Sequence, residues 1–299
     1  MLAPPRGDED TGHAPCARTS GPARLRLSRS IQWPPTFSIS TVLLFVGAIL
    51  FGALVLLPIV AIFGRVLPSG LLLSTLGKPI VVEALRLTVF TTVLTLGLAL
   101  LLGTPIAWLL ARRPFPGRSL LDSLIELPMV LPPAVAGIGL LMAFGRRGIF
   151  GPALESLGLT IGFTTAAVVL AQLFVAAPFY VRAARSGFLA VDRELEVVSY
   201  TLGVSHWATF WRVTVPVALP SLLGGAVMCW ARALGEFGAT IMFAGSFPGR
   251  TQTMPLAIYG ALETDLDAAL VLSAILVVVA FLVLFLLRQV VGRLGAIDA

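Results

Sequence analysis

Six apolar segments, each about 20 residues long or longer, constrain this chain more than any other feature of its sequence. They cover residues 41–63, 85–111, 120–144, 164–185, 217–243 and 268–287. A helix of that length crosses the hydrocarbon core of a bilayer, so the sequence predicts an all-α membrane protein with six transmembrane helices. The composition agrees, because 57% of the 299 residues are hydrophobic and only 12% are charged.

Prolines interrupt two of these segments. Gly103-Thr104-Pro105 lies inside the second, and Pro128 and Pro132-Pro133 lie inside the third. Kinks in a membrane are tolerated where neighbouring helices cover the freed backbone groups. We therefore expect a packed bundle rather than isolated spans.

Residues 1–37 differ from the rest of the chain. They are rich in Pro, Gly, Ser and Arg and carry the acidic run Asp8-Glu9-Asp10. This composition predicts a disordered tail, followed by a transmembrane domain over residues 38–299. The tail is too long and too mixed for the start of a signal peptide, so the first span is expected to be retained.

Basic residues are distributed unevenly between the two sides of the six spans. Fourteen of the 21 Lys and Arg residues fall on the side that holds both termini, six fall on the other side, and Arg232 lies inside a span. The excess is still nine against six without the tail. The positive-inside rule places the richer side in the cytoplasm, so both termini and the loop between the fourth and fifth spans are expected there. The basic balance thus reflects membrane topology and does not indicate binding of nucleic acid.

The loop between the fourth and fifth spans mixes polar and apolar residues, and residues 194–220 read ELEVVSYTLGVSHWATFWRVTVPVALP. Asp192 is suited to cap a first short helix, and Gly203 is suited to end it in the left-handed conformation. Ser205 would cap a second short helix, which Pro216 and Pro220 would separate from the fifth span. The second helix would carry the aromatic residues Trp207, Phe210 and Trp211.

The residues of this loop allow two interpretations. Two short helices joined by a glycine form a protruding element that suits a partner protein. Alternatively, the loop lies at the membrane surface with its tryptophans among the lipid headgroups. The residues of the loop alone favour neither.

Motifs for catalysis are missing from the sequence. The Gly77-Lys78 pair has Leu72 and Pro79 where a phosphate-binding loop needs glycine and Ser or Thr. There is no H-E-x-x-H, and His13 and His206 are the only histidines. The two cysteines, Cys16 and Cys229, fall in the polar tail and in an apolar span, so neither a disulfide nor a metal site is predicted. We expect no enzyme activity, no metal and no cofactor.

Charged residues also occur within or near the predicted spans: Glu126, Arg232 and Glu236. Such residues are costly in a membrane and are candidates for function. Arg232 and Glu236 are four positions apart on one predicted helix, so they can form an ion pair. Either the pair fixes the rotation of its helix, or it forms a polar patch on a translocation path with Arg232 available to an oxyanion.

Several stretches resemble the permeases of ABC importers. The loop resembles their cytoplasmic coupling loop, with Gly203 followed about a dozen residues later by Val213-Thr214-Val215-Pro216. Where that family usually has an acid and two alanines, this chain has Val197-Val198-Ser199, with Glu196 one position earlier. The run ARALGEFGATIMFAGSFPGRTQTMPLAIY, residues 231–259, is similar to molybdate-type permeases and more distantly to sulfate permeases. Residues 128–148 and 163–182 resemble the same group, and the whole resemblance covers about residues 83–287.

The resemblance implies a fold and a set of partners. The fold would be that of a type I ABC importer permease, with a coupling loop at about residues 190–216. Within it, the coupling residues would be Glu196, Gly203, Ser205, Trp207, Phe210, Trp211 and Pro216. The partners would be a second copy of the chain, cytoplasmic ATP-binding subunits that hydrolyse ATP, and an extracytoplasmic oxyanion-binding protein. The location would be the cytoplasmic membrane.

Molybdate is the cargo that the resemblance favours. Sulfate, tungstate or another oxyanion is the first alternative. An ion-coupled secondary transporter is a second one, but it would predict an inverted repeat with matching broken helices, which the sequence does not show.

Overall fold

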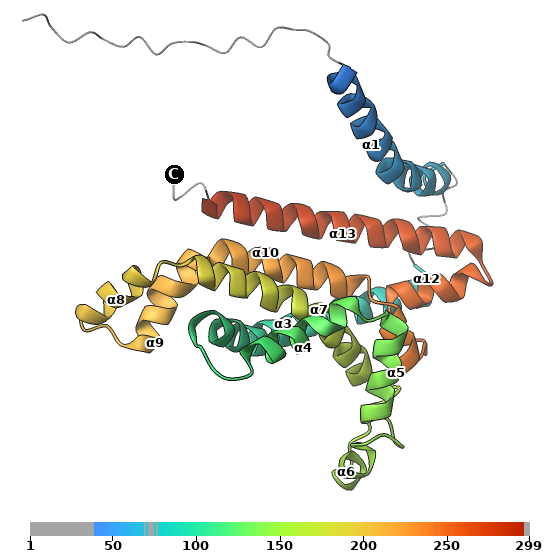
Figure 1. Cartoon of the computed structure of the whole chain (residues 1–299). Coiled ribbons are helices and arrows are strands. Elements are labelled where there is room, and N and C mark those ends of the chain that lie inside the picture. Colours follow the sequence, from blue (N-terminus) through green and yellow to red (C-terminus); the bar gives the residue numbers. More distant parts are fainter. Residues whose placement is uncertain (1–38, 69, 71–74, 76, 296–299) are drawn as a thin grey trace, which may run out of the picture. The chain divides into compact units, whose positions relative to one another are not determined.

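The computed structural model describes residues 39–68, 70, 75 and 77–295, so the predicted tail lies outside the described residues. The described part contains helices and no strands. The helices are α1 (Ile39–Val66), α3 (Pro79–Arg112), α4 (Arg118–Val130), α5 (Pro133–Phe144), α6 (Gly151–Ser156), α7 (Thr165–Ala190), α8 (Arg193–Thr201), α9 (His206–Thr209), the π-helix η1 (Phe210–Thr214), α10 (Val215–Leu234), α11 (Gly238–Ala244), α12 (Met254–Leu262) and α13 (Leu266–Gly295) (Figure 1).

The chain divides into two compact units, one ending at Phe51 and one beginning at Gly52. The described part of the first unit is the start of α1, where apolar side chains such as Leu44 and Phe51 are exposed. Exposed apolar side chains on a helix of this length suit contact with lipid or with another membrane protein.

Five stretches of helix are long and apolar enough to cross a membrane: Thr41–Val66, Pro79–Arg112, Thr165–Ala190, His206–Leu234 and Leu266–Phe285. The pair α4 and α5 counts as a sixth span if it is taken as one broken helix. The predicted all-α membrane fold is therefore confirmed, although two of the expected spans differ in detail.

The third span, predicted over residues 120–144, is interrupted as expected, because α4 ends at Val130, α5 begins at Pro133 and the two helices meet at an angle of 117°. Pro132 holds the preceding Leu131 in an extended conformation, and Pro132 and Pro133 both lack an amide hydrogen for a helical bond. In the second span the expected interruption at Pro105 is absent, because α3 continues through it.

The fifth span was predicted over residues 217–243, with Pro216 and Pro220 separating it from the loop. That prediction was wrong, because the helix runs without a break from His206 through both prolines to Leu234. Pro216 follows a π-helical turn, in which the Val215 N–H donates to the Phe210 carbonyl five residues back. At its other end the helix stops at Gly235, and α11 begins only at Gly238.

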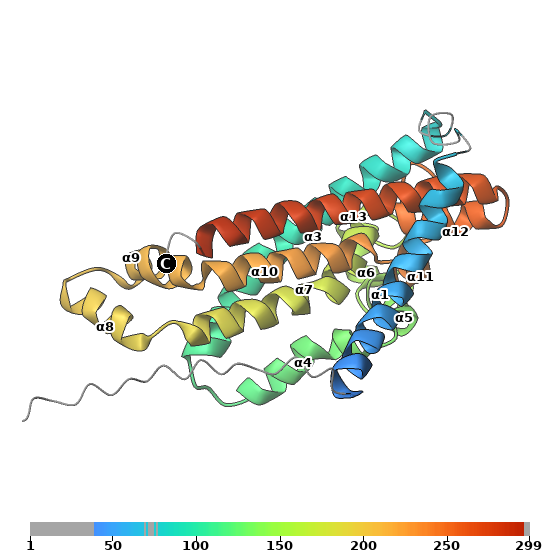
Figure 2. The same cartoon turned by 90° about the horizontal axis from the view of Figure 1, so that it is seen from above.

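Helix α7 is the centre of the second unit. It packs against α3 and α10, which lie beside it in both views, and its first turns also contact α5 and α11 (Figures 1 and 2). Glycines allow these close approaches. A Cβ atom at Gly103 of α3 would lie 2.9 Å from a ring carbon of Tyr180, and one at Gly225 of α10 would lie 2.7 Å from Cβ of Ala183. Small residues thus serve here as they do between membrane helices generally.

Polar side chains of α3, buried or partly buried, bond to polar groups of neighbouring helices. The Thr95 hydroxyl donates to Gln172 Oε1 at 3.1 Å, and the hydroxyls of Thr104 and Tyr180 lie 2.6 Å apart. Thr88 accepts from the backbone N–H of Met254 at 2.7 Å and so ties α3 to the start of α12. These bonds supply partners that the hydrocarbon of a membrane cannot.

Candidate functional site

The loop between α7 and α10 begins with a capped helix, as predicted. The carboxylate of Asp192 accepts the backbone N–H of Glu194 at 3.0 Å and so caps α8. At the other end Gly203 has φ +81°. Its N–H donates to the Tyr200 carbonyl, and the N–H of Val204 donates to the Ser199 carbonyl. These two hydrogen bonds are typical of a helix that ends on a residue in the left-handed conformation. Glycine adopts that conformation without strain.

The second helix of the loop starts at the predicted cap. Ser205 Oγ accepts the N–H of Ala208 at 3.3 Å, and α9, η1 and α10 then continue as one helix. A hydrogen bond of 2.9 Å between the buried hydroxyls of Ser199 and Thr209 joins α8 to α9. The loop is therefore an internally bonded pair of helices rather than an irregular connection.

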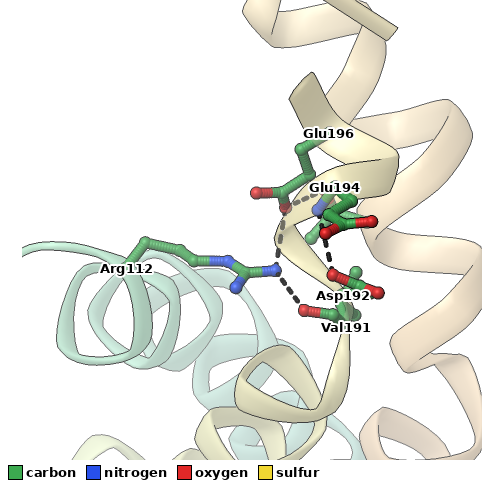
Figure 3. A network of polar contacts seen from close by, with 6 residues as sticks. Arg112, Val191, Asp192, Glu194 and Glu196 are labelled. Carbon is green, nitrogen blue, oxygen red and sulfur yellow. Dashed lines mark hydrogen bonds and ion pairs between the residues drawn. The ribbon is translucent and has the colours of Figure 1, made fainter. Parts of the chain in front are cut away.

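Glu196 lies at the centre of a polar cluster on the inner side of the loop (Figure 3). Its Oε1 accepts from Nη2 of Arg112 at 3.0 Å and from the Thr214 hydroxyl at 2.7 Å. Arg112 Nη2 also donates to the Val191 carbonyl at 3.1 Å. The exposed fractions of the Arg112 and Glu196 side chains are 8% and 13%. One carboxylate thus connects the last turn of α3, helix α8 and η1.

Arg112 is a residue that reasoning from the sequence did not single out. It was counted only among the basic residues that follow the second span. Its partner, Glu196, lies 84 positions further along the chain. An arginine at the end of a span and an acid in the first turn of a later helix are both common. No local pattern indicates that they meet.

The aromatic residues of the loop have different surroundings. Phe210 packs inward, with ring centroids 6.1 Å from Trp108 and 6.0 Å from Phe188. Trp207 and Trp211 are 71% and 51% exposed. Phe210 therefore holds the loop on the helices, whereas the two tryptophans are available for contacts with other molecules.

Arg232 and Glu236 form the predicted ion pair, with 2.7 Å between Nη1 and Oε2. They do not share one helix as predicted, because α10 ends at Leu234. The other oxygen of Glu236 accepts the backbone N–H of Ala239 at 2.7 Å, in the first turn of α11. Glu236 is 1% exposed, whereas the side chain of Arg232 is 28% exposed. The pair thus holds the break between two helices.

The structure does not bring this pair to the loop. Trp207 and Arg232 lie near opposite ends of the continuous helix His206–Leu234, about 37 Å apart at 1.5 Å per residue. The third charged candidate, Glu126, lies on α4 and faces Arg182 at 3.8 Å, with both side chains well exposed. Beside it, Asp122 forms a closer ion pair with Arg185. Among the described residues no three His, Cys, Asp or Glu side chains are grouped as metal ligands.

Residues 103–294 match the model of one family, described as the binding-protein-dependent transport system inner membrane component. The matched range includes the loop, the Arg112 cluster and the Arg232–Glu236 pair. It therefore covers every element of the candidate site.

Curated relatives and solved structures agree with this match. The chain is 50% identical over 202 residues to the molybdenum transport system permease protein ModB of Mycobacterium tuberculosis, covering 67% of this chain and 76% of the relative. It is 38% identical over 240 residues to the sulfate transport system permease protein CysW of Synechococcus elongatus, covering 78% and 84%. A chain of a bacterial alginate ABC transporter, solved with an alginate pentasaccharide-bound periplasmic protein, has a similar fold, with TM-score 0.68, 14% identity and coverage of 85% and 94%.

Removing the arginine from the Glu196 cluster is expected to destabilise the protein. Arg112→Met leaves a nearly buried carboxylate without its counter-charge, which lowers the free energy of unfolding by about 3–5 kcal/mol. Adding Glu196→Met should restore much of that loss, because an apolar pair of similar volume needs no counter-charge. Thermal unfolding of the full-length protein in detergent measures both.

Arg182→Met is the matched control. It breaks an exposed ion pair of 3.8 Å with Glu126, which contributes about 1 kcal/mol or less. Equal loss of stability in Arg112→Met and Arg182→Met would contradict the importance that we give to the Glu196 cluster.

Proposed function

The chain belongs to the family of binding-protein-dependent transport system inner membrane components, and we propose that it is the permease subunit of an ATP-driven importer of molybdate. It is a multi-pass protein of the cytoplasmic membrane. Its part is to form the path across the membrane, and a separate subunit hydrolyses ATP. The observation that carries this proposal is the family match over residues 103–294, which covers the loop, the end of α3 and the helices α4 to α12.

Molybdate is supported by the names of the relatives. Besides the mycobacterial protein, they include a molybdate/tungstate permease of Thermococcus kodakarensis, 38% identical over 82% of this chain. Sulfate is the second candidate, because the Synechococcus relative reaches the same identity over a similar share of the chain. The two ions are tetrahedral dianions, so discrimination falls mainly to the extracytoplasmic binding protein that delivers them.

The loop is the proposed contact with the ATP-binding subunits, and the arginine count supports a cytoplasmic position for it. The exposure of its tip supports this role. Leu202, beside Gly203, is 78% exposed, and Trp207 and Trp211 are exposed as well. The shape of the loop depends on the ion pair of Glu196, the turn at Gly203 and the cap at Ser205. Phe210 packs the loop on the helices, and Pro216 lies in the helix that follows it. Movement of the tip would reach α3 through Arg112. Two copies of the chain would then alternate between inward-open and outward-open states, driven by ATP and by the loaded binding protein.

Reconstitution tests this function. The full-length chain, its ATP-binding subunit and its binding protein are placed in vesicles, and uptake of radioactive molybdate is followed with ATP on the cytoplasmic side. We expect ATP-dependent uptake that excess tungstate reduces more strongly than excess sulfate. Stronger competition by sulfate would assign the sulfate alternative, and uptake driven by an ion gradient without ATP would overturn the importer class.

Changing the loop glycine is expected to uncouple transport. Gly203→Val places a β-branched residue at φ +81°, a conformation that costs about 1–2 kcal/mol or more of free energy. The backbone relieves this strain by changing the direction in which α9 leaves α8. ATP hydrolysis by the complex should persist while uptake falls severalfold, with normal amounts of protein in the membrane. The assay is the ratio of molybdate transported to ATP hydrolysed.

Gly158 provides the control for that variant. It has φ +70° and open space around the position of a Cβ atom, as Gly203 has, but it lies after α6 and far from the loop. Gly158→Val should therefore keep the wild-type ratio. The coupling role of Gly203 would be disproved by a wild-type ratio in Gly203→Val.

We further propose that Arg232 lies on the translocation path, supported by its partial exposure next to a fully buried partner. The variant Arg232→Met with Glu236→Gln removes both charges, and the Gln oxygen can still accept the Ala239 N–H. Folding should be maintained, while uptake falls about tenfold or more through loss of a charged hydrogen bond to the anion. Normal uptake by a normally folded variant would leave only the structural role of the pair.

A further inference from the structure

A groove of about 990 Å³ runs between α3 and the loop. On the α3 side it is lined by apolar residues, among them Leu101 and Trp108, and on the loop side by aromatic residues, among them Trp207 and Trp211. Leu101 is 68% exposed. A groove of this size that leaves large apolar side chains uncovered is suited to an apolar occupant.

The groove reaches into the depth of the membrane. Its lining on α3 extends from Gly97 to Arg113, which is about 24 Å along a helix axis. The hydrocarbon core of a bilayer is about 30 Å thick. Since α3 is a spanning helix and Gly97 lies near its middle, the groove leads from the middle of the membrane to one surface.

Arginines gather at the surface end of the groove. Arg112, Arg113 and Arg193 line it there, and Glu196 is the one acidic residue of the lining. Glu196 is already bound by Arg112. Within the described part of the chain, Arg113 and Arg193 form no ion pair, and both are exposed. Two guanidinium groups are therefore free to bind an anion at the level of the headgroups.

We propose that this groove binds an anionic phospholipid, with an acyl chain along α3 and the phosphate between Arg113 and Arg193. The lining changes from apolar residues to free arginines over about 24 Å. This length is close to half of a bilayer with its headgroups, which is about 40–45 Å thick, and so matches one leaflet of lipid and its headgroup. The indole of Trp108 suits the boundary between the two. A water-soluble subunit can cover the tip of the loop, but it does not enter the membrane as far as Leu101.

This lipid site is independent of the cargo. It rests on the membrane location of the chain and on the described residues, so failure of molybdate transport would leave it standing. Under the proposed orientation the lipid belongs to the cytoplasmic leaflet. Its headgroup would then lie beside the contact with the ATP-binding subunit.

Lipid binding to the full-length protein provides the first test. Purified protein is exchanged into nanodiscs of phosphatidylcholine containing increasing phosphatidylglycerol, and the rise of its unfolding temperature with phosphatidylglycerol gives an apparent affinity. Arg113→Gln with Arg193→Gln should weaken this affinity roughly thirtyfold, as expected for the attraction of two arginines. Arg146→Gln with Arg147→Gln, an equal change of charge in the exposed loop before α6, should leave it unchanged.

An equal response of both double variants, or no difference between the two lipids in the wild type, would overturn the proposal. A photoreactive benzophenone residue at Leu101, with both arginines kept, provides a second test that does not depend on the folding of the arginine variants. Mass spectrometry should find a phospholipid adduct. Cross-linking to a second copy of the chain or to the ATP-binding subunit would identify the groove as a protein interface instead.

Discussion

The close approach of α7 to its neighbours is the constraint on which the rest of the structure depends. Glycine and alanine at the crossings let α3 and α10 come near enough for a few side chains to bond across the gap, such as Thr104 with Tyr180. In a membrane this packing has no help from the exclusion of water, so shape and hydrogen bonds carry it. Only with α3 held beside α7 does the end of α3 lie where Arg112 can bind Glu196.

Polar groups then decide where regular helix ends. Glu236 is buried because it has two functions, as the partner of Arg232 and as acceptor for the first turn of α11. Glu196 is likewise shared by α3, α8 and η1. Glu236 lies at a break between two helices and Glu196 in the first turn of α8, where free backbone amides or a second chain segment provide partners. Glu126, an acid on the surface, forms only an exposed ion pair with Arg182 and does not fix the end of a helix.

Local signals allowed much of this structure to be predicted. The length of the apolar segments indicated the spans, and the caps at Asp192 and Ser205 and the stop at Gly203 could be inferred from preferences of single residues. The features that could not be predicted depend on contacts between distant parts of the chain. Arg112 was missed because its partner lies two spans further along, whereas the interruption between α4 and α5 could be inferred from the adjacent Pro132 and Pro133.

The continuity of the helix from His206 to Leu234 has a mechanical consequence. Its 29 residues form a rod about 43 Å long that begins inside the loop and ends beside the Arg232–Glu236 pair. Such a rod acts as a lever, since a tilt of about 10° at the loop displaces the far end by about 7 Å. Two prolines and a π-helical turn lie near its base, where bending is easiest. The stiffness of the helix between Phe210 and Pro220 therefore determines how much of a displacement of the loop is transmitted to the opposite face of the membrane.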